Sequence, residues 1–216
     1  MPQTPGAIGV LISGRGSNLQ ALIDAVNDGR LAAPISIVIS NNARADGLRR
    51  AEAAGIETLV LDHRAFGSRD DYDAALARAL QARKVTLVCL AGFMRLIGPS
   101  LLDAFPNAIL NVHPSLLPAF PGIDAQAQAL AHGVCVSGAT VHLVTGELDG
   151  GPIVLQAAVP VLDDDTPETL AARILVEEHR IFPEAVNIVL NHRWRIDGRR
   201  FRRGPATTTS PESAGR

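Results

Sequence analysis

The sequence predicts an α/β fold with a doubly wound, mainly parallel sheet that gains antiparallel strands near its C-terminal end. Short runs of Val, Ile and Leu alternate with helical patterns through the first two-thirds of the chain. This alternation is expected when parallel strands are buried on both faces by crossover helices. After Gly133, two strand-like runs follow one another directly, which indicates an antiparallel pair.

Five apolar runs are expected to form the buried strands, namely 8–13, 35–40, 57–61, 85–91 and 108–113. Helical patterns occupy the intervals, at 19–26, 47–54, 72–82 and 99–105. Gly29 and Gly55 are placed to end two of these helices, because glycine readily adopts the left-handed conformation found there. The first two-thirds of the chain therefore predict repeated strand–helix units.

The C-terminal third is expected to begin with paired strands at 136–145 and 152–162. A long helix should start near Thr166, which is a good N-cap, and Pro183 should kink or interrupt it. Asp197-Gly198 then predicts a hairpin within 194–201. We expect residues 1–203 to form a single domain and residues 204–216 to be a disordered tail, since the tail has few apolar residues.

Composition restricts the partners of the chain. With 216 residues, 47% of them hydrophobic, the chain can bury a large core, and its formal net charge of −2 argues against binding to nucleic acid. Its two cysteines suit a reducing cytoplasm rather than a disulfide framework. No export signal or membrane segment is indicated. We therefore expect small-molecule partners, a cytoplasmic location and either a monomer or a homodimer.

The run Ala108 to Pro114 is the first candidate for chemistry. Asn111 and His113 are two residues apart on an expected strand, so both side chains should project from one face just before Pro114 ends the ladder. An amide and an imidazole placed together in this way suit a catalytic edge. They are equally ordinary at a transition from strand to loop, so the pattern alone leaves both interpretations open.

The loop Gly14 to Asn18 is the second candidate, between the first strand and its helix. Its glycines let backbone N–H groups at a helix start approach a phosphate closely. Leu19 replaces the third glycine of a dinucleotide-binding motif, so a single phosphate is the more natural ligand. The alternative is a tight turn in which Ser17 or Asn18 merely caps the helix.

Three further features remain ambiguous from the residues alone. Met94, Leu96 and Ile97 follow a central strand and either line a slot for a heteroaromatic ring or close the core. Asp149 either makes a turn or stabilises protonated His113. Glu178 falls within the apolar stripe of the late helix, so it is either a buried structural acceptor or a substrate contact.

The motifs together resemble the glycinamide ribonucleotide formyltransferases of purine biosynthesis. The resemblance runs from Ile8 to about Phe201 and is carried by these segments: LISGRGSNLQAL, LAGFMRLI, LNVHPSLLPAFPG, ELDGGPI and EEH. The NxHPSLLP motif with a later DxGP is shared more widely, including by formyl-methionyl-tRNA formyltransferase and formyltetrahydrofolate hydrolase. Those enzymes have an additional domain for which this chain has no room, so another formyl-folate formyltransferase or hydrolase stays as the alternative.

The resemblance implies transfer of a formyl group from 10-formyltetrahydrofolate, the co-substrate, to the amine of phosphoribosylglycinamide, without a metal. It implies catalytic roles for Asn111, His113 and Asp149. It assigns the ribonucleotide to Gly16, Ser17, Asn18 and Glu178, and the folate to Arg69, Met94, Arg95, Leu96, Ile97 and Asn111. The six histidines lack a paired metal-ligand spacing, in agreement with the absence of a metal.

The residue types suit this chemistry. Asn111 can donate an N–H to the oxyanion of a tetrahedral intermediate, and His113 can serve as the general acid. The chain departs from the family pattern at 123–128, where many relatives have histidines or basic residues, so we expect no catalytic role for this segment. By alternation along its strand, His142 faces either the site or the opposite side.

Two interpretations from other classes are a nucleotide-binding regulatory module that uses only the glycine loop, and an NAD-dependent dehydrogenase. The dehydrogenase would require the third glycine that Leu19 replaces. The regulatory module would retain ligand affinity and cellular role after His113→Ala, whereas a formyltransferase would lose activity.

Overall fold

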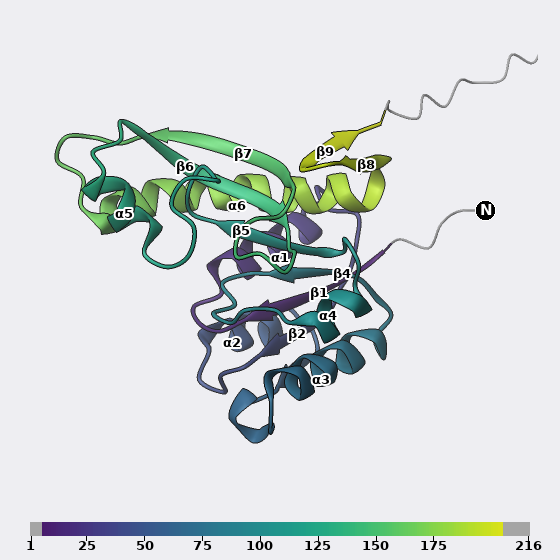
Figure 1. The fold of residues 1–216 in the computed structure, drawn as a ribbon. Helices are drawn as coiled ribbons and strands as arrows, with labels where there is room; N and C mark the ends of the chain where they lie inside the picture. Colours follow the sequence, from purple (N-terminus) through teal and green to yellow (C-terminus); the bar gives the residue numbers. More distant parts are fainter. Residues whose placement is uncertain (1–5, 205–216) are drawn as a thin grey trace, which may run out of the picture.

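The computed structural model describes residues 6–204, so the expected tail, apart from Gly204, lies outside the described residues. Nine strands form one sheet (Figure 1). The strands are β1 (Ala7–Ile12), β2 (Ile35–Ser40), β3 (Thr58–Val60), β4 (Val85–Leu90), β5 (Ile109–His113), β6 (Val136–Leu143), β7 (Ile153–Pro160), β8 (Trp194–Asp197) and β9 (Arg200–Arg203). The helices are α1 (Ser17–Asn27), α2 (Asp46–Ala53), α3 (Arg69–Gln81), α4 (Pro99–Ala104), α5 (Ala125–Ala131) and α6 (Pro167–Asn191), and η1 (His63–Ala65) is a 3₁₀ turn.

The sheet order is β3-β2-β1-β4-β5-β6-β7-β9-β8. The first five strands in this order are parallel, whereas β6 runs antiparallel to both β5 and β7. β9 joins β7 through a single parallel pair, and β8 is antiparallel to β9. The predicted fold class is confirmed.

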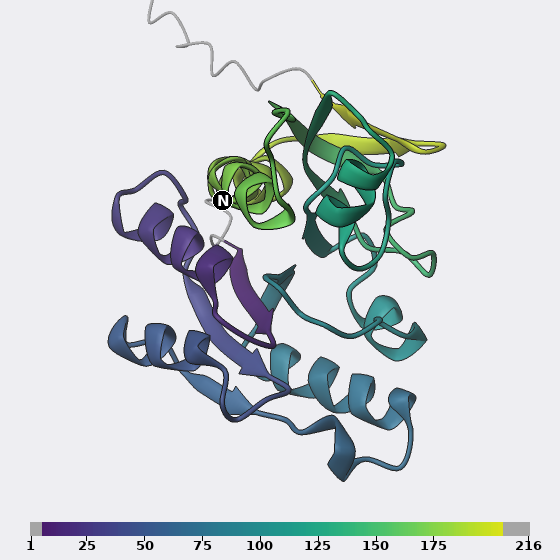
Figure 2. The ribbon, with the colours of Figure 1, turned by 90° about the vertical axis from the view of Figure 1, so that its left-hand side faces the viewer.

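Side chains that alternate along the strands divide the core between the two faces of the sheet. On β1, Val10 belongs to the core cluster that includes residues of α1, α2 and α6, whereas Leu11 belongs to the cluster that includes residues of α3 and α4. Figure 2 shows these two groups of helices on opposite sides of the sheet. The parallel strands are therefore buried on both sides, as their continuous apolar runs predicted.

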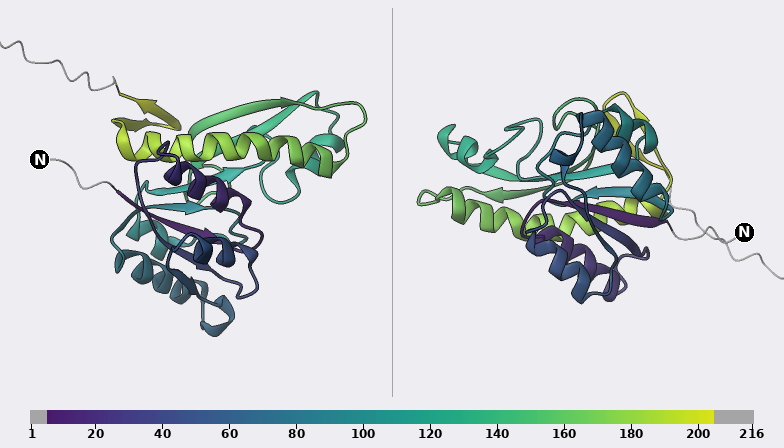
Figure 3. Two further views of the ribbon diagram at one scale, coloured as in Figure 1. Left: turned by 180° about the vertical axis from the view of Figure 1, so that it is seen from behind. Right: turned by 90° about the horizontal axis from the view of Figure 1, so that it is seen from below.

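The expected interruption at Pro183 is wrong, because α6 continues from Pro167 to Asn191 (Figure 3). Proline removes one backbone N–H from the helix ladder. Here Pro183 and its neighbours Phe182, Ala185 and Val186 are buried against the sheet, so tertiary packing offsets that loss.

Two local details also differ from expectation. The segment 125–131, for which no helix or strand was predicted, forms helix α5. In the C-terminal hairpin the two residues between the strands are Gly198 and Arg199, one position later than predicted, with Gly198 at a φ of 60°. Within residues 6–204, no helix is long and apolar enough to cross a membrane.

Candidate active site

The candidate site lies at the carboxyl ends of β1, β4 and β5, which are adjacent in the sheet. Ligands of open α/β sheets commonly bind at this edge. On β5, Leu110 and Val112 pack into the core cluster beneath α1 and α6. Asn111 and His113 alternate with them and therefore project from the opposite face, as the sequence predicted.

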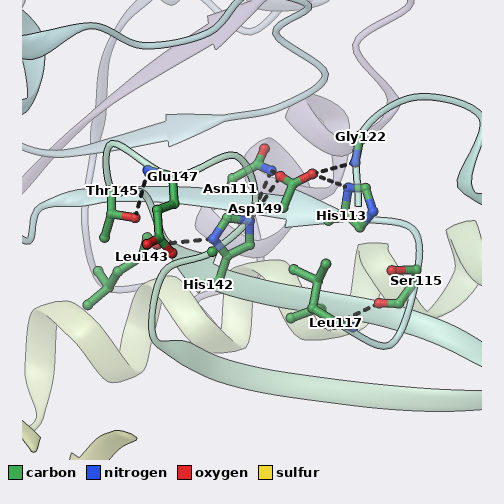
Figure 4. Close-up of polar contacts among 12 residues, drawn as sticks. Asn111, His113, Ser115, Leu117, Gly122, His142, Leu143, Thr145, Glu147 and Asp149 are labelled. Carbon is green, nitrogen blue, oxygen red and sulfur yellow. Dashed lines mark hydrogen bonds and ion pairs between the residues drawn. The ribbon is translucent and has the colours of Figure 1, made fainter. Parts of the chain in front are cut away.

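Asp149 joins Asn111 and His113 from the loop between β6 and β7 (Figure 4). One of its carboxylate oxygens, Oδ2, lies 3.4 Å from Nδ1 of His113. The other, Oδ1, accepts a long hydrogen bond of 3.4 Å from the Asn111 amide. The side chains of His113 and Asp149 are 5% and 9% exposed, so solvent screens this ion pair weakly. The structure thus brings the three expected catalytic side chains into one cluster.

The segment after β5 closes over this cluster through its backbone. Nε2 of His113 donates to the carbonyl oxygen of Phe120 at 2.8 Å, and the Gly122 N–H donates to Asp149 Oδ2 at 2.8 Å. Both ring nitrogens of His113 therefore face acceptor oxygens, an arrangement that suits the imidazolium form, which donates from both. Sequence reasoning did not identify Phe120 and Gly122 because their contributions come from backbone groups.

Thr140, on β6, supports the closing segment, which is the stretch of chain between the end of β5 and Gly122. Its buried hydroxyl donates to the Ser115 carbonyl at 2.6 Å and accepts from the Leu117 N–H at 3.0 Å. Gln156 donates to the same hydroxyl at 3.0 Å and to the Leu117 carbonyl at 2.9 Å. These bonds tie the segment to the β6–β7 pair and set the path by which it reaches Asp149.

His142 faces the site, opposite Asn111 in the β5–β6 register. Its Nδ1 donates to the carbonyl of Leu143 at 3.0 Å, which leaves Nε2 as the acceptor of the neutral ring. The Asn111 amide lies 3.2 Å from that Nε2, and Asp149 Oδ1 lies 3.5 Å from it. His142 thus helps to orient the Asn111 carboxamide, with nitrogen rather than oxygen toward the cluster.

Asp149 is ionised more readily than an ordinary aspartate. Burial alone would raise its pKa, but a hydrogen bond from the protonated form of His142 and one from the Gly122 N–H oppose that effect, together with the charges of the two histidines in their protonated forms. The net result is a pKa below the ordinary value of 3.8. A carboxylate anion therefore sits between His113 and His142 at neutral pH.

The glycine loop and α6 meet beside the end of β1. Gly16 has a φ of 72° and approaches the backbone of Gly47, where a Cβ on Gly16 would lie 2.6 Å from the Gly47 Cα. Next to it, the Asn18 amide donates to Glu178 Oε2 at 2.6 Å. Both side chains are more than nine-tenths buried, and Asn18 Oδ1 has no hydrogen-bond partner within the described residues. This pair leaves a buried acceptor next to the start of α1.

Glu178 confirms its expected position on the apolar face of the late helix. It is 7% exposed, and burial raises its pKa, while the hydrogen bond from Asn18 acts in the opposite direction. A cavity of about 380 Å³ opens on the outer side of the same region, lined by Ser17, Arg50 and His179 among others. Ser17 thus lines an opening, whereas Asn18 and Glu178 are buried and do not belong to its lining.

The segment 91–98 between β4 and α4 borders the cluster and is joined to the end of β1. The Ser13 N–H donates to the Gly92 carbonyl at 3.1 Å, and the Met94 N–H donates to the Ser13 hydroxyl at 2.9 Å. Met94 is 74% exposed and Leu96 is 52% exposed, as a binding slot requires, whereas Ile97 packs against the core. Arg69 begins α3 and lies beside Gly98, at the far end of this segment.

Residues 123–128, where the chain departs from the family pattern, form the approach to α5 and its first turn. Asp124 is exposed, with a φ of 55°, and makes no side-chain cap. Gln128 donates to the Ile123 carbonyl at 2.8 Å and to the Pro121 carbonyl at 3.3 Å. Gln128 therefore braces the segment that carries Gly122 without contacting the cluster.

Neither cysteine belongs to the cluster. Cys89 is fully buried within β4, and burial raises the pKa of its thiol, whereas Cys135 is exposed just before β6. Within residues 6–204, no group of three or more His, Cys, Asp or Glu side chains is arranged to hold a metal ion.

Comparison with known proteins agrees with this geometry. The sequence profile described as "Formyl transferase" matches residues 7–186. The chain belongs to the formyl transferase family. Its sequence is 45% identical over 190 residues to Phosphoribosylglycinamide formyltransferase of Escherichia coli, covering 88% of this chain and 87% of that protein.

Longer proteins of the family contain the same region. The Trifunctional purine biosynthetic protein adenosine-3 of Gallus gallus is 48% identical over 182 residues, covering 84% of this chain but 18% of that protein. The chain thus spans less than a fifth of the length of the trifunctional relatives.

A solved structure of the family matches the fold closely. Glycinamide ribonucleotide transformylase 1 from Symbiobacterium toebii superposes with a TM-score of 0.91 at 58% identity, covering 92% of this chain and 94% of that one. The arrangement of the sheet and its covering helices is therefore that of a formyl transferase.

Proposed function

We propose that this formyl transferase moves the formyl group of 10-formyltetrahydrofolate to the amine of 5'-phosphoribosylglycinamide, a step of purine biosynthesis. The observation that carries the proposal is the cluster of Asn111, His113 and Asp149 at the sheet edge, next to a glycine loop suited to phosphate. The E. coli relative, nine-tenths of which this chain matches, is named for the same reaction.

The ribonucleotide is assigned to the glycine loop and α6. Gly16 allows close approach to the start of α1, where the N–H groups near Ser17 and Asn18 can bind the phosphate. Glu178 is the acceptor for hydroxyl or amide groups farther along the substrate. Its burial supports this role, because a carboxylate that has lost its hydration is strongly stabilised when the substrate brings a hydrogen-bond donor to it.

The folate is assigned to the segment between β4 and α4. Exposed Met94 and Leu96 flank the backbone at Arg95, whose N–H and C=O groups can bind the polar edge of the ring, and Ile97 supports the slot from the core. Arg69 lies at the end of the same segment, where its cation suits the carboxylates of the folate tail. Asn111 faces the formyl group between the two substrates.

Asn111 and His113 handle the charges that form during transfer. Attack of the amine on the formyl carbon creates an oxyanion and a cationic nitrogen, and the folate N10 leaves with a proton. The Asn111 carboxamide has two N–H groups, so one can remain with His142 while the other leaves its long hydrogen bond to Asp149 Oδ1 and donates to the oxyanion. His113 supplies the proton for N10, directly or through water, with Asp149 stabilising its cationic form. The cationic amine nitrogen gives up its own proton in the same step, and that proton restores His113.

Transfer is direct in this proposal, because among residues 6–204 no nucleophilic side chain joins the cluster and neither cysteine contacts it. We further propose that residues 1–203 act as one domain, as a monomer or homodimer in the cytoplasm. The ternary complex of the two substrates with the protein is then the reacting species.

The deciding experiment incubates the purified chain with phosphoribosylglycinamide and 10-formyltetrahydrofolate carrying ¹³C in the formyl group. The proposal expects the label to appear in formylglycinamide ribonucleotide, and His113→Ala to lose this activity while still binding both substrates. Parallel reactions with methionyl-tRNA and with water alone test the other formyl-folate enzymes. Label in either of those products, with none in the ribonucleotide, contradicts the proposal.

A further inference from the structure

The segment between β4 and α4 is held from behind by a buried carboxylate of α3. Asp73 is 1% exposed, and its Oδ2 accepts a hydrogen bond of 2.6 Å from the Gly98 N–H. Gly98 is the N-cap residue of α4 and provides no side-chain cap. A Cβ at Gly98 would lie 2.7 Å from the Asp73 carboxylate, so glycine is what allows this close contact. Asp73 therefore fixes the point where the segment ends and α4 begins.

The neighbouring residue of α3 holds the middle of the same segment. Tyr72 is buried, and the guanidinium carbon of Arg95 lies 5.4 Å from the centroid of its ring, within the range of a cation–π contact. Phe66 packs edge-on against the same ring at 5.4 Å. The Tyr72 hydroxyl has no hydrogen-bond partner among residues 6–204, so the ring makes the contact with Arg95 and the hydroxyl does not contribute.

These contacts direct the Arg95 side chain back toward α3. Its Nε is buried without a hydrogen-bond partner within the described part of the chain, so the guanidinium depends on Tyr72 and on the charge of Asp73. The residues on either side of Arg95 remain exposed, namely Met94 and Leu96. Because the Arg95 side chain points inward, the segment presents the backbone of Arg95 and the side chains of Met94 and Leu96 on its outer side.

We propose that Asp73 and Tyr72 are positioning residues for folate binding, acting through Gly98 and Arg95 to hold residues 94–97 in the conformation that takes the folate ring. This inference rests on the proposed function, because it assigns the ring to that segment. Neither residue is expected to touch the folate. They affect the free energy of folate binding indirectly, because they order the segment before the folate arrives.

The test measures binding of 10-formyltetrahydrofolate by calorimetry, together with KM for each substrate and the thermal unfolding midpoint. Asp73→Ala removes the acceptor of the buried Gly98 N–H and is expected to raise the folate Kd about 10-fold or more. The KM for the ribonucleotide is expected to stay within about twofold, because Asn18 and Glu178 lie on other elements. Asp73→Asn retains an acceptor oxygen and is expected to restore most of the affinity.

Two matched variants separate positioning from general damage to α3. Tyr72→Phe keeps the ring and removes only the unpartnered hydroxyl, so folate affinity is expected to be unchanged, whereas Tyr72→Leu is expected to weaken it. Asp70→Asn alters an exposed carboxylate of α3 that accepts from Ser100 on α4, and it is expected to leave folate affinity unchanged.

Three outcomes are decisive. A wild-type protein that does not bind the folate refutes the proposed function rather than this inference. A folate Kd unchanged in both Asp73→Ala and Tyr72→Leu overturns the inference. Parallel losses of affinity for both substrates, in step with the unfolding midpoint, show a merely structural role and also overturn it.

Discussion

Asp149 Oδ2 lies 3.4 Å from Nδ1 of His113, although the two residues are far apart in sequence and come from the β6–β7 loop and the end of β5. The same oxygen accepts a hydrogen bond from the Gly122 N–H, so the carboxylate connects His113 to the segment that covers it. One anion therefore both stabilises protonated His113 and sets its position. The expected effects of substitution follow from these two roles.

Asp149→Asn is expected to lower kcat by about 10²-fold or more, because the amide cannot stabilise imidazolium and one of its ends presents N–H groups to His113 or to Gly122. Kd values for both substrates are expected to change little. Steady-state kinetics with separate binding titrations check this split. A rise in ribonucleotide Kd without loss of kcat would place Asp149 in binding instead.

The pKa of Asp149 also predicts how stability depends on pH. Its folded pKa lies below the ordinary value of 3.8, so its contribution to stability is present above that value and is lost as pH falls through the folded pKa. The unfolding free energy of the wild type should therefore converge toward that of Asp149→Asn as the solution is acidified below about pH 4. Urea denaturation from pH 3 to pH 7 measures this. A difference between the two proteins that stays constant over this range is the contrary result.

We predict that the buried Glu178 carboxylate lowers the free energy of unfolding at neutral pH, although it strengthens binding of the ribonucleotide. Its folded pKa is raised above the ordinary value of 4.5, so its contribution is present below that value and is lost as pH rises through the folded pKa. Glu178→Gln retains an acceptor for Asn18 without the buried charge, so at neutral pH it is expected to unfold at an equal or higher urea concentration than the wild type.

The same variant is expected to bind phosphoribosylglycinamide about 10-fold or more weakly, because a charged acceptor is lost. Glu177→Gln is the control, since Glu177 pairs with Arg180 on the same helix, whereas Asn18 donates to Glu178. Equal affinities for Glu178→Gln and Glu177→Gln would exclude a substrate contact at Glu178.

Thr140→Val tests the support of the closing segment. The substitution preserves shape but leaves the Leu117 N–H and the Ser115 carbonyl without their buried partner, which is expected to cost about 1–3 kcal/mol of unfolding free energy. It is also expected to lower kcat, because the segment carries the Phe120 and Gly122 groups that hold His113 and Asp149. A variant as active and as stable as the wild type would show that this network does not position the segment.

The sequence was sufficient to predict the fold class and several of these groups. Alternation placed Asn111 and His113 on one face, and the helical stripe placed Glu178 toward the core, because both follow from local periodicity. The contact between Asp149 and His113 depends on how the β6–β7 loop packs against the end of β5, which no local pattern encodes. The position of His142 depends on the β5–β6 register, and a shift of one residue would have turned it away.

The wrong expectation at Pro183, and the features that were not predicted, also have physical reasons. Pro183 breaks isolated helices, but the buried side chains around it keep α6 continuous. Helix α5 has an Ala- and Gln-rich sequence without a capping side chain, so no start signal marked it. The groups of Phe120 and Gly122 belong to the backbone, and only the path of the chain reveals them.

A double-mutant cycle on formyl transfer tests the central claim most directly, using kcat/KM of the wild type, His113→Ala, Asp149→Asn and the double variant. If Asp149 acts through His113, the double variant should be about as slow as His113→Ala alone, because without the imidazole the carboxylate has nothing to stabilise. Losses that multiply across the two positions would show that they act independently and would contradict the account.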